Sequence, residues 1–498
     1  MSACTRPFFH TRALCLAVLA AGMVFTAYAQ AQVALTQLST DTFTDTPSQH
    51  ETEVEPGTFS YGSTIVSAFQ VARIYSGGGA DIGFATSTDA GTSWTNGYLP
   101  GITIYQGGTH SAASDAAVAY DAMHGVWLIA TLPIASNTSV AVSRSADGLT
   151  WGDPITIKGS ASADKNWIVC DNTSTSPYYG HCYAEWDNTN DGDLIQMSTS
   201  TDGGQTWGSV MATAAQDYGI GGVPVVQPKG IVIVPILGFA GNGEVTAYTS
   251  TNGGASWTKA VNVASYTSHA EAGTLRSGGL VTSAIDAAGK VYVFWPDCRF
   301  RVGCTSNDIV YSTSSNGTKW SAGKRVPIDA VSSTVDHFIT GTAIAPGTKG
   351  AKAQIALVYY FYPVSKCGSD CSLNVGFVQS STGGSKWTAP ETLAGPMELT
   401  WLPETFSGTM VADYVSVGFG GGKVFPVFAT AQAKAGSLFH EAIYTTASGL
   451  KASTPETELM SADGDRPVPN AHSDHGPMEY LDQEHEIPRS GKRPPERD

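Results

Sequence analysis

Short apolar segments, separated by stretches rich in Gly, Ser, Thr, Asn and Asp, recur along most of this chain. The first set spans residues 57–62, 64–71 and 81–86, and a later set spans residues 278–284, 290–295 and 308–313. Segments of this length, bounded by turn-forming residues, predict β-strands. Long helical patterns are few, so the chain is predicted to be all-β.

A turn motif follows the third strand of each set and occurs six times. Its first copy, residues 87–94, reads Ser-Thr-Asp-Ala-Gly-Thr-Ser-Trp. In such a turn the Asp or Asn side chain bonds its own backbone and Gly supplies a positive φ. The Trp begins the next strand and buries a large ring between neighbouring sheets. The six copies cover residues 87–94, 145–151, 200–207, 250–257, 314–320 and 380–387.

The Trp residues that end the six copies lie 50 to 67 residues apart, a period typical of propellers. Two strand-like segments precede the one that enters each turn, and a short one follows the Trp. Each repeat therefore predicts a four-stranded antiparallel blade of a β-propeller. Residues 413–419, 423–429 and 441–446 predict three further strands, and residues 33–39 are expected to supply their fourth strand and close the ring. Seven blades are predicted; six remain the alternative if the last strands complete a shared blade.

Both ends of the chain differ from the repeats. Arg6 and Arg12 precede an apolar run over residues 13–21, and Ala27-Tyr28-Ala29 matches a small-x-small cleavage site. Residues 1–29 are therefore predicted to be a signal peptide rather than a membrane anchor. Residues 30–450 are expected to form the propeller. Pro, Glu, Asp, Arg and His dominate residues 451–498, which predicts a disordered tail.

Charge and localisation narrow the possible partners. The formal net charge is −16 and no basic stripe occurs, so nucleic acid and anionic membrane surfaces are poor partners. We expect an exported monomer, extracellular or periplasmic, with no membrane span after signal cleavage.

The cysteines agree with export. Cys4 and Cys15 fall within the predicted signal peptide, and the other six form three local pairs. An even number of cysteines at short spacings predicts disulfides in an exported chain. The predicted pairs are Cys170 with Cys182, Cys298 with Cys304, and Cys367 with Cys371.

No metal and no cofactor are expected. No cysteine pair has a further Cys or His at the spacing of a metal site. The turn at residues 187–193 resembles part of a calcium loop, but the twelfth position of such a loop is Ser198, which is not acidic.

The six turns resemble the Asp boxes, or bacterial neuraminidase repeats, of the sialidase superfamily, and the resemblance covers residues 33–450. It implies a propeller fold, whereas the reaction varies among such propellers. In the family the boxes lie on the face away from the active site. Substrate is bound by the starts of the innermost strands and by the loops between second and third strands.

Carried over to this chain, that rule places two sets of residues on the functional face. The innermost-strand starts carry Glu53, Glu55, Asp115, Asp164, Lys165, Arg276, Asp336, His337, Asp413 and Tyr414. The second-to-third loops carry Arg73, Tyr75, the turn at 187–193, Asp297, Arg299, Arg301, Tyr362 and Lys366.

The resemblance also implies a chemistry. Sialidases hold the sugar carboxylate with three arginines, and they use an Asp acid/base and a Tyr nucleophile activated by a Glu. By that comparison the candidate catalytic residues are Asp115, Asp413, Tyr414 and Glu55. The candidate substrate-binding residues are Arg73, Arg276, Arg299, Arg301, Asp336 and His337. Glu404 is a further carboxylate upstream of Tyr414. The family's Arg-Ile-Pro motif is absent, and the most similar sequence is Arg73-Ile74-Tyr75.

Several candidates have a structural alternative. Arg299 and Arg301 alternate and would project together from an extended loop, or they cap carbonyl groups inside a disulfide loop. The aspartates alternatively bond backbone amides around the central channel, and Tyr414 alternatively lines that channel.

Three functions remain open. They are a sialidase-type exo-glycosidase, a non-catalytic propeller that binds a glycan or a protein, and a hydrolase or lyase for another polysaccharide that uses two carboxylates. The missing Arg-Ile-Pro motif favours the second, and the arginines gathered on one face favour the first. The expected partner is a glycan or glycoconjugate.

Overall fold

The computed structural model describes residues 33–239 and 243–469. The predicted signal peptide, residues 1–29, lies outside the described residues, as do residues 470–498 of the predicted tail. Within the described part the chain is all-β, with five short 3-10 turns and no α-helix. The 3-10 turns are η1 (Ile104–Gln106), η2 (Thr189–Asp191), η3 (Gly350–Lys352), η4 (Leu399–Trp401) and η5 (Pro455–Thr457).

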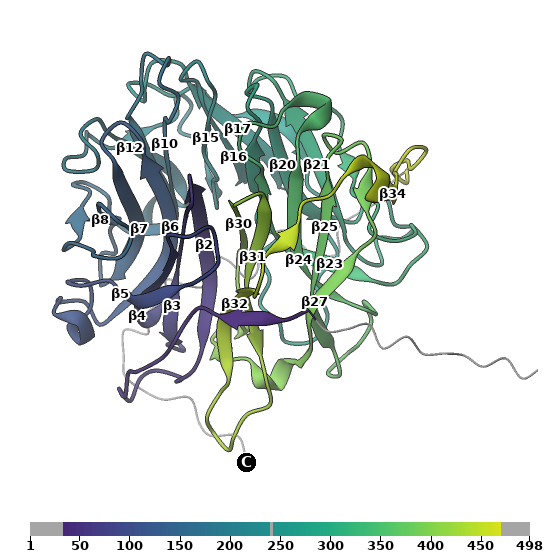
Figure 1. The fold of residues 1–498 in the computed structure, drawn as a ribbon, viewed down its shortest axis with the longest axis horizontal. Helices are drawn as coiled ribbons and strands as arrows, with labels where there is room; N and C mark the ends of the chain where they lie inside the picture. The colour runs from purple at the N-terminus through teal and green to yellow at the C-terminus, as the bar shows by residue number, and fades with distance from the viewer. Residues whose placement is uncertain (1–32, 240–242, 470–498) are drawn as a thin grey trace, which may run out of the picture. The chain divides into compact units, whose positions relative to one another are not determined.

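Antiparallel strands follow one another in groups of four along the described chain (Figure 1). The first group is β2 (Glu53–Tyr61), β3 (Thr64–Arg73), β4 (Gly79–Ser87) and β5 (Thr95–Tyr98). The second is β6 (Ala112–Asp121), β7 (Val126–Ile134), β8 (Ala141–Ser145) and β9 (Ile155–Thr156). A single pairing of Gly79 with Ala113 joins these two groups into one sheet.

The next two groups repeat this order. The third is β10 (Ala163–Cys170), β11 (Cys182–Asn188), β12 (Leu194–Ser200) and β13 (Met211–Ala212). The fourth is β14 (Gly219–Ile220), β15 (Val225–Val226), β16 (Val232–Gly238), β17 (Glu244–Ser250) and β18 (Val261–Ser265). Its two short initial strands, β14 and β15, both pair with β16.

The fifth and sixth groups complete the repeats that carry turn motifs. The fifth is β19 (Thr282–Ile285), β20 (Val291–Asp297), β21 (Asp308–Ser314) and β22 (Lys324–Arg325). The sixth is β23 (Asp336–Ile344), β24 (Ile355–Tyr362), β25 (Ser372–Ser380) and β27 (Glu391–Glu398). A small hairpin, β28 (Glu404–Thr405) and β29 (Gly408–Thr409), follows.

The last sheet joins the two ends of the described chain. It contains β30 (Ser416–Gly420), β31 (Lys423–Ala431) and β32 (Glu441–Thr446), with β33 (Leu450–Lys451) beside β31. The early strand β1 (Leu35–Gln37) pairs with β32, from Leu35 opposite Thr446 to Gln37 opposite Tyr444 (Figure 1). The prediction that residues near 33–39 add the fourth strand here is confirmed.

The first strands of neighbouring groups pack against one another. β2 contacts β6 and β30, β6 contacts β10, β10 contacts β15, β15 contacts β19, β19 contacts β23, and β23 contacts β30. Glycines permit the closest approaches. A Cβ atom on Gly57 would lie 2.3 Å from the Ala116 carbonyl oxygen, and one on Gly341 would lie 2.1 Å from that of Val415.

The six turn motifs share one hydrogen-bond pattern, which the sequence predicted. In the first, the Gly91 amide donates to Ser87 Oγ (2.7 Å), and the Ser93 amide donates to Asp89 Oδ1 (2.9 Å). The Trp rings that follow pack between sheets; Trp151, Trp257 and Trp387 are buried. Since Ser87 pairs with Ile65, each turn lies at the end of its sheet where the first and second strands are joined.

The predicted disorder after residue 451 is wrong for residues 452–460. η5 and β34 (Glu458–Met460) form there, and β34 pairs with β26 (Trp387–Thr388). The buried Glu458 explains this order. Its carboxylate accepts bonds from the Ser381 amide, from Thr382 Oγ1 (2.9 Å) and from Ser453 Oγ (2.9 Å). Thr382 stands where the other turns carry Asp or Asn, so the tail supplies the carboxylate that this turn lacks.

Three disulfides confirm the predicted cysteine pairs: Cys170–Cys182, Cys298–Cys304 and Cys367–Cys371. The second and third close loops between the second and third strands of the fifth and sixth groups. Among the described residues, no helix has the length and apolar character needed to cross a bilayer.

Candidate functional site

Four first strands carry a bulge at the end opposite the turn motifs. The pairing register shifts there in β2, β6, β10 and β23, and one residue of each bulge has a positive φ. These residues are Glu55 (59°), Asp115 (52°), Lys165 (47°) and Ile339 (45°). Side chains other than glycine rarely adopt this conformation, and such strain concentrates at functional sites. Three of the four bulges therefore present a charged side chain at the same level of the fold.

An ion-pair network connects these bulges to later strands. One oxygen of Asp413 accepts bonds from both Arg276 Nη2 and Lys165 Nζ, the latter at 3.2 Å. Lys165 Nζ also lies 3.5 Å from Asp164 Oδ1. All four side chains are buried. Asp413 is thus held between two cations that come from different groups of strands.

Glu55 joins the same network through the backbone and through Gln70. The Asp413 amide donates to Glu55 Oε1 (3.2 Å), and Gln70 Nε2 donates to Glu55 Oε2. Gln70 in turn accepts a bond from Arg73 Nη1 (3.1 Å) through its own Oε1. Asp115 joins through its Oδ2, which accepts the Lys165 amide (2.9 Å). We call Glu55, Arg73, Asp115, Asp164, Lys165, Arg276 and Asp413 the polar cluster.

Burial sets the protonation of Glu55. Removal from water, reinforced by the nearby Asp413 and Asp115, raises the pKa of Glu55 well above its usual range. Burial disfavours the ionised form, and neighbouring carboxylates add to that effect. Burial therefore favours the neutral form of Glu55, which lies beside a carboxylate that two cations hold.

Tyr414 lies at the edge of the polar cluster. Its ring packs edge-on against Trp167, with centroids 5.3 Å apart and planes at 83°. Burial, followed by the charges of Glu55 and Asp115, raises the pKa of Tyr414 well above its usual range. Glu404 is exposed in the β28–β29 hairpin, where its amide donates to Gln49 Oε1 (2.9 Å). The carboxyl groups that raise the pKa of Tyr414 thus include Glu55, Asp115 and Asp413.

A small cavity reaches the polar cluster from this end of the sheets. It has a volume of about 100 Å³ and is lined by Gly78, Ser114, Asp164 and Asn190. Ser114 Oγ donates to Asp115 Oδ1 (2.6 Å), and the Gly78 carbonyl accepts from Arg73 Nη1 (2.9 Å). The cavity walls are therefore in direct contact with the cluster.

Arg299 and Arg301 belong to internal contacts outside the polar cluster. Arg299 binds the Asp297 carboxylate and the Ser265 carbonyl, and it lies over the Trp295 ring at 5.8 Å. Arg301 binds Asp308 through two nitrogens and donates to the Ala330 and Ser333 carbonyls (2.9 Å each). Their loop is a turn, with the Arg301 amide donating to the Cys298 carbonyl (2.9 Å), so the two side chains diverge.

Asp336 and His337 also form hydrogen bonds with residues outside the polar cluster. Asp336 accepts bonds from the Asn307 amide (2.6 Å) and from His269 Nδ1 (3.2 Å). His337 Nδ1 lies 3.0 Å from the Asn307 carbonyl, and burial lowers the pKa of its imidazole. Asp336 thus bonds a backbone amide, as the structural alternative predicted. The same is true of Asp115 and Asp164, whose carboxylates both accept a hydrogen bond from the Lys165 amide.

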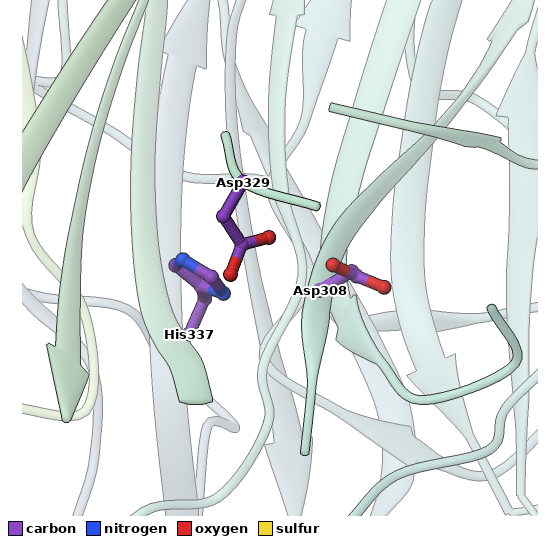
Figure 2. A group of neighbouring side chains, drawn as sticks. All are labelled: Asp308, Asp329 and His337. Carbon is purple, nitrogen blue, oxygen red and sulfur yellow. The ribbon is translucent and has the colours of Figure 1, made fainter. Parts of the chain in front are cut away.

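His337 forms a second cluster with Asp308 and Asp329, whose ligand atoms lie within 4.8 Å of one another. Figure 2 shows His337 and Asp329 pointing toward each other, with Asp308 across from them. The donor types suit a metal ion, but Arg301 and Arg325 both bind Asp308 and Asp329. Two guanidinium groups already neutralise the two carboxylates, so these residues form a structural ion-pair network and fit a metal ion poorly.

Sequence reasoning missed the central position of Lys165 and the bridging role of Gln70. The sequence places Lys165 on this face without indicating a role for it, and it indicates no role for Gln70. The available signal for Lys165 was the pair Asp164-Lys165 at a strand start. Gln70 lies within the apolar strand β3 and is buried, so a polar side chain there was the signal to follow.

No protein-family model and no curated protein matches the chain. Among solved structures, it is similar to a protein of unknown function from Dyadobacter fermentans, with 13% identity over 70% of this chain and 98% of that chain (TM-score 0.46). It is also similar to a leech intramolecular trans-sialidase, with 13% identity over 78% of this chain and 67% of that chain (TM-score 0.39). A third is the intramolecular trans-sialidase from Ruminococcus gnavus, with 11% identity over 76% of this chain and 90% of that chain (TM-score 0.38). At these identities, function is argued from the residues of this chain.

Proposed function

We propose that the chain is an exported, sialidase-like β-propeller of seven blades that binds an acidic glycan at the polar cluster. Seven groups of four or five strands, and the contacts that run from β2 through each first strand to β30 and back to β2, support the propeller. The three disulfides support export, because such bonds persist in oxidising compartments.

The observation that carries the glycan proposal is the gathering of Arg73, Lys165 and Arg276 in one buried network with Asp413. Guanidinium and ammonium groups are the side chains that recognise a sugar carboxylate. Asp413 occupies the position of such an anion, since one oxygen touches two of the cations. The small cavity beside Ser114 and Asp164 gives the entry side. A glycan carboxylate would compete with Asp413 for these cations.

Hydrolysis of the terminal sugar is the second candidate, and Glu55 favours it. A carboxyl group whose pKa is raised by burial is suited to protonate a leaving oxygen, while water adds to the sugar carbon. The raised pKa of Tyr414 disfavours its use as a nucleophile, because the phenolate is the reactive form. Asp115 is then the candidate base that takes the proton of the water.

Binding and turnover are tested in parallel. The 4-methylumbelliferyl glycosides of sialic acid, glucuronic acid, galactose and glucose are assayed for fluorophore release, and the same acidic sugars are titrated as ligands. We expect binding of an acidic sugar and its loss in Arg276→Ala. The matched control is Arg144→Ala, at the turn-motif end, where Arg144 donates to the Gly203 carbonyl (2.6 Å).

The outcomes separate the two candidates. Fluorophore release that is lost in Glu55→Gln supports hydrolysis, whereas binding without release supports a non-catalytic propeller. Absence of both for every acidic sugar, with folded protein, contradicts the glycan proposal.

A further inference from the structure

A second, larger cavity of about 590 Å³ lies among the first strands. Its walls come from β2, β6, β10, β15, β19, β23 and β30, and from the residues that flank them. Lys165 and Tyr414 line the end nearest the polar cluster, and Thr173, Asp286 and Pro346 line the end where first and second strands are joined. This volume falls within the range of small-molecule sites.

The walls of this cavity are mainly apolar. The side chains include Trp167, Val225, Leu280, Ile344 and Phe419. Among the described residues that line it, Lys165 and Asp286 carry charge. Lys165 is paired with Asp413, and Asp286 accepts the Ala288, Lys290 and Gly350 amides. The rest of the described lining carries no charged side chain, so the body of the cavity suits a neutral occupant.

One polar side chain in the wall has its hydrogen-bonding capacity unused. Asn166 is 2% exposed, and neither its Oδ1 nor its Nδ2 has a hydrogen-bond partner within the described part of the chain. Burying an amide without partners is unfavourable, so such groups normally meet a ligand or water. Asn166 is one of the residues that line the cavity, as are its chain neighbours Lys165 and Trp167.

We propose that this cavity binds a small, neutral, largely apolar molecule with one hydrogen-bonding group, which the Asn166 amide receives. Trp167, the next residue in the chain, packs against Tyr414, and both line the cavity and supply aromatic surface for a planar body. The site is distinct from the proposed glycan site, because it extends toward the turn-motif end and requires no charged ligand.

One fluorescent probe and two competing ligands test the site. N-phenyl-1-naphthylamine reports occupancy by its fluorescence. It is then displaced by naphthalene and, separately, by 2-naphthol, which differ by one hydroxyl group. We expect one saturable site with energy transfer from protein tryptophan, and 2-naphthol displacing the probe at a several-fold lower concentration than naphthalene. A neutral hydrogen bond predicts a preference of about fivefold.

Variants assign the binding to this cavity. Asn166→Leu should bind the probe but lose the preference for 2-naphthol, and Val225→Trp should fill the cavity and abolish binding. Val302→Trp, which adds an indole at an exposed position, is the control and should bind as the parent does. Leu280→Phe replaces Val225→Trp if that variant does not fold, as judged by circular dichroism.

Three results would overturn the proposal: no saturable binding, as for a cavity that holds only water; unchanged binding in the filled variants; or an unchanged preference for 2-naphthol in Asn166→Leu.

Discussion

Arg276 and Asp413 form a fully buried ion pair between residues 137 positions apart in the chain. Arg276 precedes the first strand of the fifth group, and Asp413 precedes that of the seventh. A buried charge is stable only when it is paired and hydrogen-bonded, so the two positions depend on each other. The pair therefore serves both the fold and the proposed glycan site.

Removing the charge of Asp413 should destabilise the protein. Asp413→Asn leaves Arg276 and Lys165 without their shared carboxylate, and breaking a buried pair in this way costs about 3–5 kcal/mol. Urea unfolding at pH 7 measures the loss. Asp370→Asn, at an exposed position, is the control and should change stability by less than about 0.5 kcal/mol. A loss below about 1 kcal/mol in Asp413→Asn would show that the network does not hold these charges.

The contact between Glu458 and the sixth turn predicts a specific double-mutant result. Thr382→Asp restores the residue type of the other turns, but it places a second carboxylate beside Glu458, so it should destabilise the protein. The same change in a Glu458→Gln background should be neutral or stabilising, because the new Asp then takes over the turn. Ser385→Asp, exposed in the same turn, is the control. Additive effects in the double mutant would contradict this account.

Buried Glu185 predicts a pH effect on stability. Burial raises its pKa to about 8 in the folded state, whereas the unfolded value is near 4.5. The folded state thus holds a proton that the unfolded state releases, and this contribution is complete below about pH 4.5 and is lost as the pH rises to about 8. Relative to Glu185→Gln, the parent should lose about 1.4 kcal/mol per pH unit over that window. Glu404→Gln, at an exposed position, should show no such trend. Parallel curves for the parent and Glu185→Gln would refute the prediction.

Export and the disulfides predict the covalent state of the mature protein. Mass spectrometry should place its amino terminus at or close to Gln30, and no thiol should react under denaturing, non-reducing conditions. Reduction should then expose six thiols, from the three disulfides. Two further reactive thiols before reduction would show that Cys4 and Cys15 are retained, against the predicted cleavage.

The parts of the fold that the sequence predicted are those set by local chemistry. The hydrogen bonds of each turn motif join residues within one segment of at most eight residues, and each cysteine pair closes a short loop. Both features can therefore be predicted from the spacing of residues in the sequence. The order of residues 452–460 was not readable, because it depends on Glu458 reaching Ser381, 77 positions away. Composition correctly describes the segment as polar, but it cannot show that one carboxylate completes a distant turn.

The candidate site was predicted in part for the same reason. Strand topology brings Glu55, Asp115, Arg276 and Asp413 to one end of the fold, and the turn motifs indicate which end. The role of each arginine could not be predicted in this way, because it depends on which side chains the arginine contacts in the folded protein. Arg301 meets Asp308, and Arg299 meets Asp297, in a loop whose turn geometry the alternation argument did not anticipate.

Titration of 3′-sialyllactose against lactose tests the central claim most directly. The account predicts saturable binding of 3′-sialyllactose by the parent, no binding of lactose, and loss of binding in Arg276→Ala but not in Arg144→Ala. Equal binding of the two sugars, or binding of 3′-sialyllactose that survives Arg276→Ala in a folded protein, would contradict a carboxylate-recognising site at the polar cluster.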